Sequence, residues 1–128
     1  MNRTIIKLFL CLCIVTALPS YAYNTVHYYF RTVDIRNGLS QNSVNCIFQD
    51  KKGFMWFGTK DGLSRYDGLS FRIYNNENSN LGRNFITVLY EDSKGNIWVG
   101  TDGGLYIYNP ILDSFTAVSY THLRAHET

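Results

Sequence analysis

The sequence predicts an all-β protein built from two similar units of four short antiparallel strands, preceded by an export signal. Three observations support this prediction. Aromatic side chains make up 16% of the 128 residues and charged side chains only 17%, a balance that is typical of strands. One sequence pattern occurs twice, in Leu39–Asp67 and in Leu81–Asn109. An uncharged apolar run follows a short basic segment at the N-terminus.

Residues 1–22 are predicted to be a signal peptide. Two basic residues precede the apolar run Leu8–Leu18, and Ser20–Ala22 supplies the small residues that a signal peptidase requires. The run is about half as long as a membrane-spanning helix. A buried helix of a cytosolic domain and a lipid anchor at Cys11 or Cys13 are weaker interpretations. We therefore expect an exported chain that is cleaved after residue 22.

The predicted cleavage changes the charge and the cysteine count. Two of the twelve Lys and Arg residues lie in the leader, so ten remain, against ten Asp and Glu. This balance gives no reason to expect contact with nucleic acid. Cys46 would be the single cysteine left, so we expect no internal disulfide.

The two copies of the pattern align without a gap, at a constant interval along the chain, and many of the aligned residues are identical. The mismatches mostly keep their type, so both the turn residues and the apolar positions recur. We interpret the pattern as a true internal repeat. The identical pairs are Leu39/Leu81, Asn42/Asn84, Asp50/Asp92, Lys52/Lys94, Gly53/Gly95, Trp56/Trp98, Gly58/Gly100, Thr59/Thr101, Gly62/Gly104, Leu63/Leu105 and Tyr66/Tyr108.

Each copy divides into short apolar strands separated by turns. The first turn begins with an Asp, whose side chain can accept backbone N–H groups, and ends with a Gly that can adopt a positive φ. A second turn contains Gly62 or Gly104. The predicted strands are Ser43–Phe48, Phe54–Thr59, Leu63–Tyr66 and Ser70–Tyr74, then Phe85–Tyr90, Ile97–Thr101, Leu105–Tyr108 and Ser114–Val118.

Four strands per unit, in a repeat of this length, are typical of a β-propeller blade. Strands that are apolar on both faces suit a blade packed between two neighbours, whereas a single β-sandwich is the weaker alternative. Because propellers close with about four to eight blades, we expect a partial propeller and an N-terminal fragment. The expected divisions are a lead-in strand at 23–38, blade 1 at 39–80, blade 2 at 81–118 and a non-native-looking tail at 119–128.

The repeat resembles the two-component regulator propeller repeat. The resemblance rests on an acidic turn followed by Trp-x-Gly-Thr and Gly-Leu-x-x-Tyr, in Gln49–Asp67 and Glu91–Asn109, and on the opening segment Gly38–Val44. It implies the ectodomain of a hybrid two-component sensor of the type found in Bacteroidetes. Such a parent would be membrane-anchored and dimeric, with further blades, cytoplasmic kinase and receiver modules, and an oligosaccharide ligand on the periplasmic side.

We predict no catalytic, cofactor-binding or metal-binding residues in this chain. Trp56 and Trp98 occupy equivalent places in both repeats, which favours core packing over ligand contact. The same argument gives a structural role to the repeat positions Asp50, Gly53, Trp56, Gly58, Thr59, Gly62, Tyr66, Asp92, Gly95, Trp98, Gly100, Thr101, Gly104 and Tyr108.

Positions that differ between the repeats are the better candidates for ligand contact. Lys60, Asp61 and Arg65 in blade 1 and Tyr106 in blade 2 are predicted to lie in loops at one end of the propeller. The predicted function is therefore a ligand-sensing propeller segment of a sensor. A fragment of a secreted propeller enzyme (a lyase or a glycosidase) and an extracytoplasmic scaffold remain alternatives.

Overall fold

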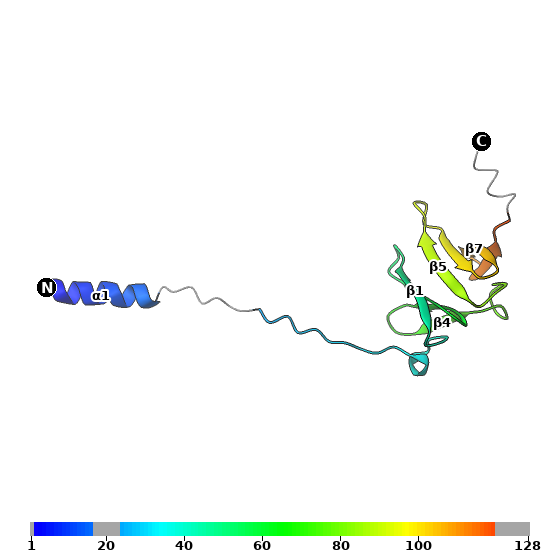
Figure 1. Ribbon diagram of the computed structural model, residues 1–128. Helices are drawn as coiled ribbons and strands as arrows, with labels where there is room; N and C mark the ends of the chain where they lie inside the picture. The colour runs from blue at the N-terminus through cyan, green and yellow to red at the C-terminus, as the bar shows by residue number, and fades with distance from the viewer. Residues whose placement is uncertain (1, 17–23, 120–128) are drawn as a thin grey trace. The chain divides into compact units, whose positions relative to one another are not determined.

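The computed structural model describes residues 2–16 and 24–119 and divides the chain into two compact units, Met1–Arg31 and Thr32–Thr128 (Figure 1). The predicted cleavage site at Ser20–Ala22 lies outside the described residues, and so does the predicted tail after Ser119.

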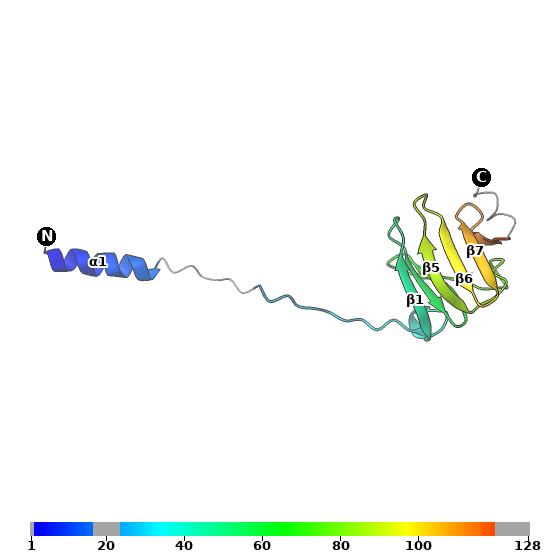
Figure 2. The same cartoon turned by 45° about the horizontal axis from the view of Figure 1, so that its top comes forward.

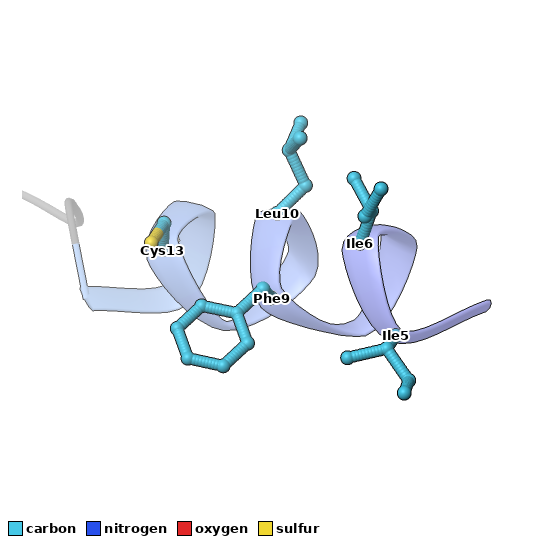
Figure 3. Close-up of a pocket in the computed structure, with 5 residues that line it drawn as sticks. All are labelled: Ile5, Ile6, Phe9, Leu10 and Cys13. Atoms are coloured by element: carbon cyan, nitrogen blue, oxygen red, sulfur yellow. The ribbon is translucent and has the colours of Figure 1, made fainter. Parts of the chain in front are cut away.

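The described residues of the first unit include a helix, α1 (Arg3–Thr16). Its apolar side chains project from successive turns (Figure 3), and those drawn are exposed. Residues 24–31 have no regular secondary structure. Within the described residues, no helix combines the length and the apolar character that crossing a membrane requires. The residues drawn in Figure 3 are Ile5, Ile6, Phe9, Leu10 and Cys13.

A single turn of 3-10 helix, η1 (Ile35–Asn37), leads into the first blade. The Asp34 side chain accepts from the Arg36 backbone N–H at 2.8 Å, and the Asn37 side chain accepts from the Asp34 N–H at 3.1 Å. Gly38 then ends the turn with a φ of 105°, a value that favours glycine. Within the expected lead-in segment at 23–38, the described residues 24–38 contain no strand, and Asp34 and Asn37 cap a helical turn.

The described residues of the second unit form two four-stranded antiparallel sheets, each in the order of the chain. All eight strands begin and end within one residue of the predicted positions, and the predicted partial β-propeller is confirmed. Blade 1 consists of β1 (Val44–Gln49), β2 (Met55–Thr59), β3 (Gly62–Tyr66) and β4 (Phe71–Tyr74). Blade 2 consists of β5 (Ile86–Glu91), β6 (Ile97–Thr101), β7 (Gly104–Asn109) and β8 (Ser114–Ala117).

The first strand of each blade carries an irregularity at the same repeat position. The register shifts between Val44 and Cys46 in β1, and between Ile86 and Val88 in β5. One residue is left unpaired at each shift, as in a β-bulge. In blade 1 that residue is Asn45, and its side chain donates to the Ile86 carbonyl of blade 2 at 2.8 Å. The bulge therefore helps to join the two blades.

The blades approach each other most closely at their first strands. Strand β1 lies beside β5 (Figure 2), and β2 also contacts β5. The buried core fills the space between the facing sheets. Trp56 of blade 1, which is fully buried, meets Tyr108 of blade 2 edge to face at a centroid distance of 5.1 Å. The other buried apolar members are Leu63, Tyr74, Leu81, Ile86, Ile97, Val99, Tyr106 and Phe115.

Candidate ligand-binding cleft between the blades

Both first turns are closed by an aspartate that also holds a tryptophan. Asp50 accepts from the backbone N–H groups of Lys52 at 2.9 Å and Phe54 at 3.0 Å, and from Trp56 Nε1 at 2.8 Å. Gly53 ends this turn with a φ of 93°. The carboxylate therefore fixes the turn and orients the indole that packs against blade 2.

Asp92 makes the equivalent bonds in blade 2. It accepts from the N–H groups of Lys94 and Asn96, both at 2.9 Å, and from Trp98 Nε1 at 3.0 Å. The hydrogen bonds from the Asn96 and Trp98 side chains hold the pKa of Asp92 well below its usual range. This turn therefore carries an ionised carboxylate at neutral pH.

Arg65 lies in β3, directly opposite Trp56 in the β2–β3 pair. Its guanidinium carbon is 4.9 Å from the centroid of Phe54 and 5.6 Å from that of Trp56. Nη1 donates to Tyr108 Oη of blade 2 at 2.6 Å. A cation so close to aromatic faces is held by their quadrupoles, so the guanidinium has a fixed place between the blades.

Asp113 of blade 2 links Arg65 to a wider polar network. Its carboxylate accepts from Tyr74 Oη at 2.6 Å and from Tyr108 Oη at 2.7 Å. Arg72 lies 2.9 Å from one carboxylate oxygen, and Arg65 lies 3.6 Å from the other. Burial alone would raise the pKa of Asp113, but the two tyrosines and the two arginines lower it below its usual value.

The pKa of Tyr74 is shifted upward, opposite to that of Asp113. Burial raises its pKa above the ordinary value, and the hydrogen bond to Asp113 raises it further. Tyr74 therefore remains a neutral donor across the physiological range. The network joins Arg65, Arg72 and Tyr74 of blade 1 to Tyr108 and Asp113 of blade 2 through ionised and neutral partners.

A cleft of about 570 Å³ opens beside this network, between the β1–β2 turn and the β5–β6 turn. Phe54, Trp56, Arg65 and Tyr108 line its inner part. The charged residues that line it are four basic ones and two acidic ones. They are Lys51, Lys52, Arg65 and Lys94, with Asp50 and Glu91.

Both acidic side chains of the cleft already accept hydrogen bonds from neighbouring N–H groups. Asp50 is bound within its own turn, as described above, and Glu91 accepts from the Lys51 backbone N–H at 2.9 Å. The Lys51 ammonium donates to the Asp92 carbonyl at 3.0 Å, which ties one turn to the other. The cleft therefore has an excess of positive charge and a partly aromatic lining.

The structure separates the four residues predicted as ligand contacts. Lys60 and Asp61 lie in the β2–β3 turn, at the opposite end of the sheet from the cleft, and Asp61 accepts from Asn84 at 3.1 Å. Arg65 lies in β3 and Tyr106 lies in β7, where it is buried. Arg65 and Tyr106 thus lie within the predicted strands Leu63–Tyr66 and Leu105–Tyr108 and not in loops, because the pairings of Thr59 with Gly62 and of Thr101 with Gly104 leave only two residues for each turn.

Equivalent side chains of the two repeats make the same hydrogen bonds at the threonine pair but different ones at the tyrosine pair. Thr59 Oγ1 donates to the Gly62 carbonyl at 2.8 Å, and Thr101 Oγ1 donates to the Gly104 carbonyl at 3.1 Å. The tyrosine pair differs in its partners. Tyr66 donates to the Gly68 carbonyl within its own turn at 2.6 Å, whereas Tyr108 is the partner of Arg65 and Asp113.

Several residues of the cleft and its network were not predicted from the sequence. Tyr74 and Asp113 lie outside the two aligned segments, so comparison of the repeats could not select them. Phe54 and Asn96 occupy equivalent positions with different chemistry, which was an available signal. Among the described residues, no group of three His, Cys, Asp or Glu side chains could hold a metal ion.

The repeats match a known family model. Residues 38–61 and 80–103 match the two component regulator propeller, and these segments include the Asp–Trp pairs described above. Each blade therefore contains one segment that is similar to the propeller repeats of two-component regulators.

Two solved structures and one curated relative are similar to parts of the chain. The extracellular domain of a putative hybrid two component system from B. thetaiotaomicron is 36% identical, with a TM-score of 0.62 over 70% of this chain and 13% of that domain. The extracellular domain of a one component system from the same organism is 26% identical, with a TM-score of 0.61 over 76% and 15%. Histidine kinase P4 of Formosa agariphila is 48% identical over 50 residues, which are 39% of this chain and 4% of the kinase.

Proposed function

We propose that this chain is a ligand-sensing propeller segment of a hybrid two-component sensor, acting on the periplasmic side of the membrane. The observation that carries the proposal is the 36% identity to the extracellular domain of a hybrid system, across most of this chain. Because the chain spans only 13% of that domain, the kinase, the receiver, the remaining blades and dimerisation belong to the proposal.

The ligand in this proposal is an oligosaccharide, and the cleft between the blades is its candidate site. The cleft has an aromatic lining and groups that can donate or accept hydrogen bonds, two features that binding of sugars requires. The repeat positions stabilise the turns and the core of each blade. Arg65 is particular to blade 1, because the equivalent position of blade 2 is Ile107.

Calorimetric titration of the full-length protein with a panel of neutral and acidic oligosaccharides tests this function. We expect at least one saturable interaction, and we expect the sugar to be recovered intact. Shortened or unsaturated products would favour a secreted enzyme over a sensor. A panel without any binding would contradict carbohydrate sensing.

Residues 1–22 are proposed to export the chain. The short apolar helix α1, with basic residues at its beginning, is compatible with a signal peptide. After expression in a Gram-negative host, we expect the periplasmic protein to begin at Tyr23. Mass spectrometry of its N-terminus checks this, and a soluble cytoplasmic product that retains residues 1–22 would contradict it.

A further inference from the structure

We propose that the cleft between the β1–β2 and β5–β6 turns binds the anionic group of a ligand, a carboxylate or a sulfate ester, with Arg65 as its anchor. The assignment of that group to an acidic sugar rests on the proposed function. Three features support the proposal: the open donors of Arg65, the unpaired lysines at the cleft and the asymmetry between the blades.

Arg65 keeps donors available for a ligand. Among the described residues, its guanidinium makes one hydrogen bond, from Nη1 to Tyr108. No buried side-chain nitrogen or oxygen of the described residues lacks a partner, so the remaining N–H groups of Arg65 reach the solvent of the cleft that it lines. The planar fork of an arginine matches the oxygens of a carboxylate or a sulfate.

The charge of Arg65 is not balanced within the network. Asp113 is 3.6 Å from Arg65, whereas it is 2.9 Å from Arg72 and accepts from two tyrosines as well. Two arginines thus share one carboxylate. Because the guanidinium side chain is only 23% exposed, solvent screens this excess charge less than it would at an open surface.

Two lysines add to the positive charge of the cleft. Lys52 and Lys94 line it, one from each turn, and both are exposed. Within the described part of the chain, neither ammonium group has a hydrogen bond or an ion pair. They are therefore free to attract an anion toward Arg65.

The walls of the cleft differ in a way that suits a sugar ring. Phe54 on one wall presents an apolar ring beside the guanidinium, and its counterpart on the other wall is Asn96. The Asn96 amide nitrogen donates to Asp92 at 2.8 Å, which leaves its oxygen to accept from a hydroxyl. One wall can stack against a ring face while the other binds a hydroxyl.

Titration of the full-length protein with three probes tests the inference. The probes are a tetra-hexuronate, its methyl ester, which removes only the charge, and inorganic sulfate. The variants are Arg65→Met and the exposed pair Lys52→Met with Lys94→Met. Lys60→Met is the matched control, since it removes one positive charge of the same blade at the far end of the sheet.

We expect the acid to bind at least about tenfold more tightly than its ester, as one charged hydrogen-bonded contact allows. The preference for the acid over its ester should weaken with added salt and disappear in Arg65→Met. It should be smaller in the double lysine variant and unchanged in Lys60→Met. Sulfate should compete with the acid. The lysine pair keeps the test valid if Arg65→Met fails to fold.

The possible outcomes separate the inference from the proposed function. Equal binding of the acid and the ester would overturn the inference and leave carbohydrate sensing intact. An equal loss in Lys60→Met would also overturn it. Binding of sulfate alone, dependent on Arg65, would support the anion site and contradict the assignment of its ligand to an acidic sugar, while the oligosaccharide panel tests carbohydrate sensing separately. Failure of all three probes to bind would overturn the inference.

Discussion

Asp50 and Asp92 each bind the backbone of their own turn and the indole of the tryptophan that follows in the next strand. One side chain thus couples the shape of a turn to the packing of a blade. This coupling explains why the Asp and the Trp recur together in both repeats. It also gives each residue a structural role without involving a ligand.

Asp50→Ala should destabilise blade 1 by about 2–3 kcal/mol, because it leaves a buried indole N–H and two backbone N–H groups without their acceptor. Hydrogen exchange of β1 and β2 peptides in the full-length protein measures the effect. Asp61→Ala is the control, since Asp61 is exposed and its side chain accepts from Asn84 at the far end of the sheet. Equal hydrogen-exchange protection of the β1 and β2 peptides in the two variants would contradict the role of Asp50.

Asp113 should make the stability of the interface between the blades depend on pH. Its pKa is lowered in the folded chain, so its contribution is complete above the unfolded pKa of about 4 and is lost as the pH falls through the folded value. Unfolding measured from about pH 6 down to about pH 2 should therefore show a shallower acid dependence in Asp113→Asn than in the unmodified protein. An equal dependence of the free energy of unfolding on pH in the two proteins would contradict this role of Asp113.

At the scale of strands, the bulges in β1 and β5 and a close contact at β2 set the spacing between the blades. Gly58 of β2 lies against Cys46 of β1 and Ile86 of β5, and a Cβ at this position would come within 2.6 Å of Ile86 Cγ2. The glycine therefore permits the first strand of blade 2 to approach the second strand of blade 1.

Gly58→Ala should lower the free energy of unfolding by about 1–3 kcal/mol, because the added methyl group overpacks the contact. Hydrogen exchange should become faster in both β2 and β5. Gly103→Ala is the matched control. A Cβ there would meet Arg83 Cγ at 2.5 Å, but that side chain is exposed and can move. A stable Gly58→Ala variant with unchanged exchange would show that the blades do not depend on this contact.

The repeat allowed all eight strands to be predicted because apolar runs and turn glycines recur at a constant interval in the two copies. The bulges were not predictable, since Asn45 and Thr87 are different residue types and no glycine marks the position in either copy. Arg65 was selected because it differs from Ile107, and it lies in the predicted strand Leu63–Tyr66, but its contact with Tyr108 of the other blade was not predictable from the repeat. Asp113 was missed because contacts between blades leave no periodic signal.

At the scale of the molecule, the two blades differ in what covers them. Trp56 is fully buried against blade 2, whereas its counterpart Trp98 is only half-buried, beside the exposed residues Val88 and Tyr90. In a propeller, each blade packs its face against the next blade. We propose that the corresponding face of blade 2 is covered by a further blade in the full-length protein.

Oxidative footprinting of the two tryptophans in the full-length protein tests this account most directly. Trp56 provides the internal standard for an indole buried between blades. If the chain forms two successive blades of a larger sensor propeller, Trp98 should be protected to the same degree as Trp56, and unfolding should expose both. A folded full-length protein in which Trp56 is protected and Trp98 reacts freely would contradict the account.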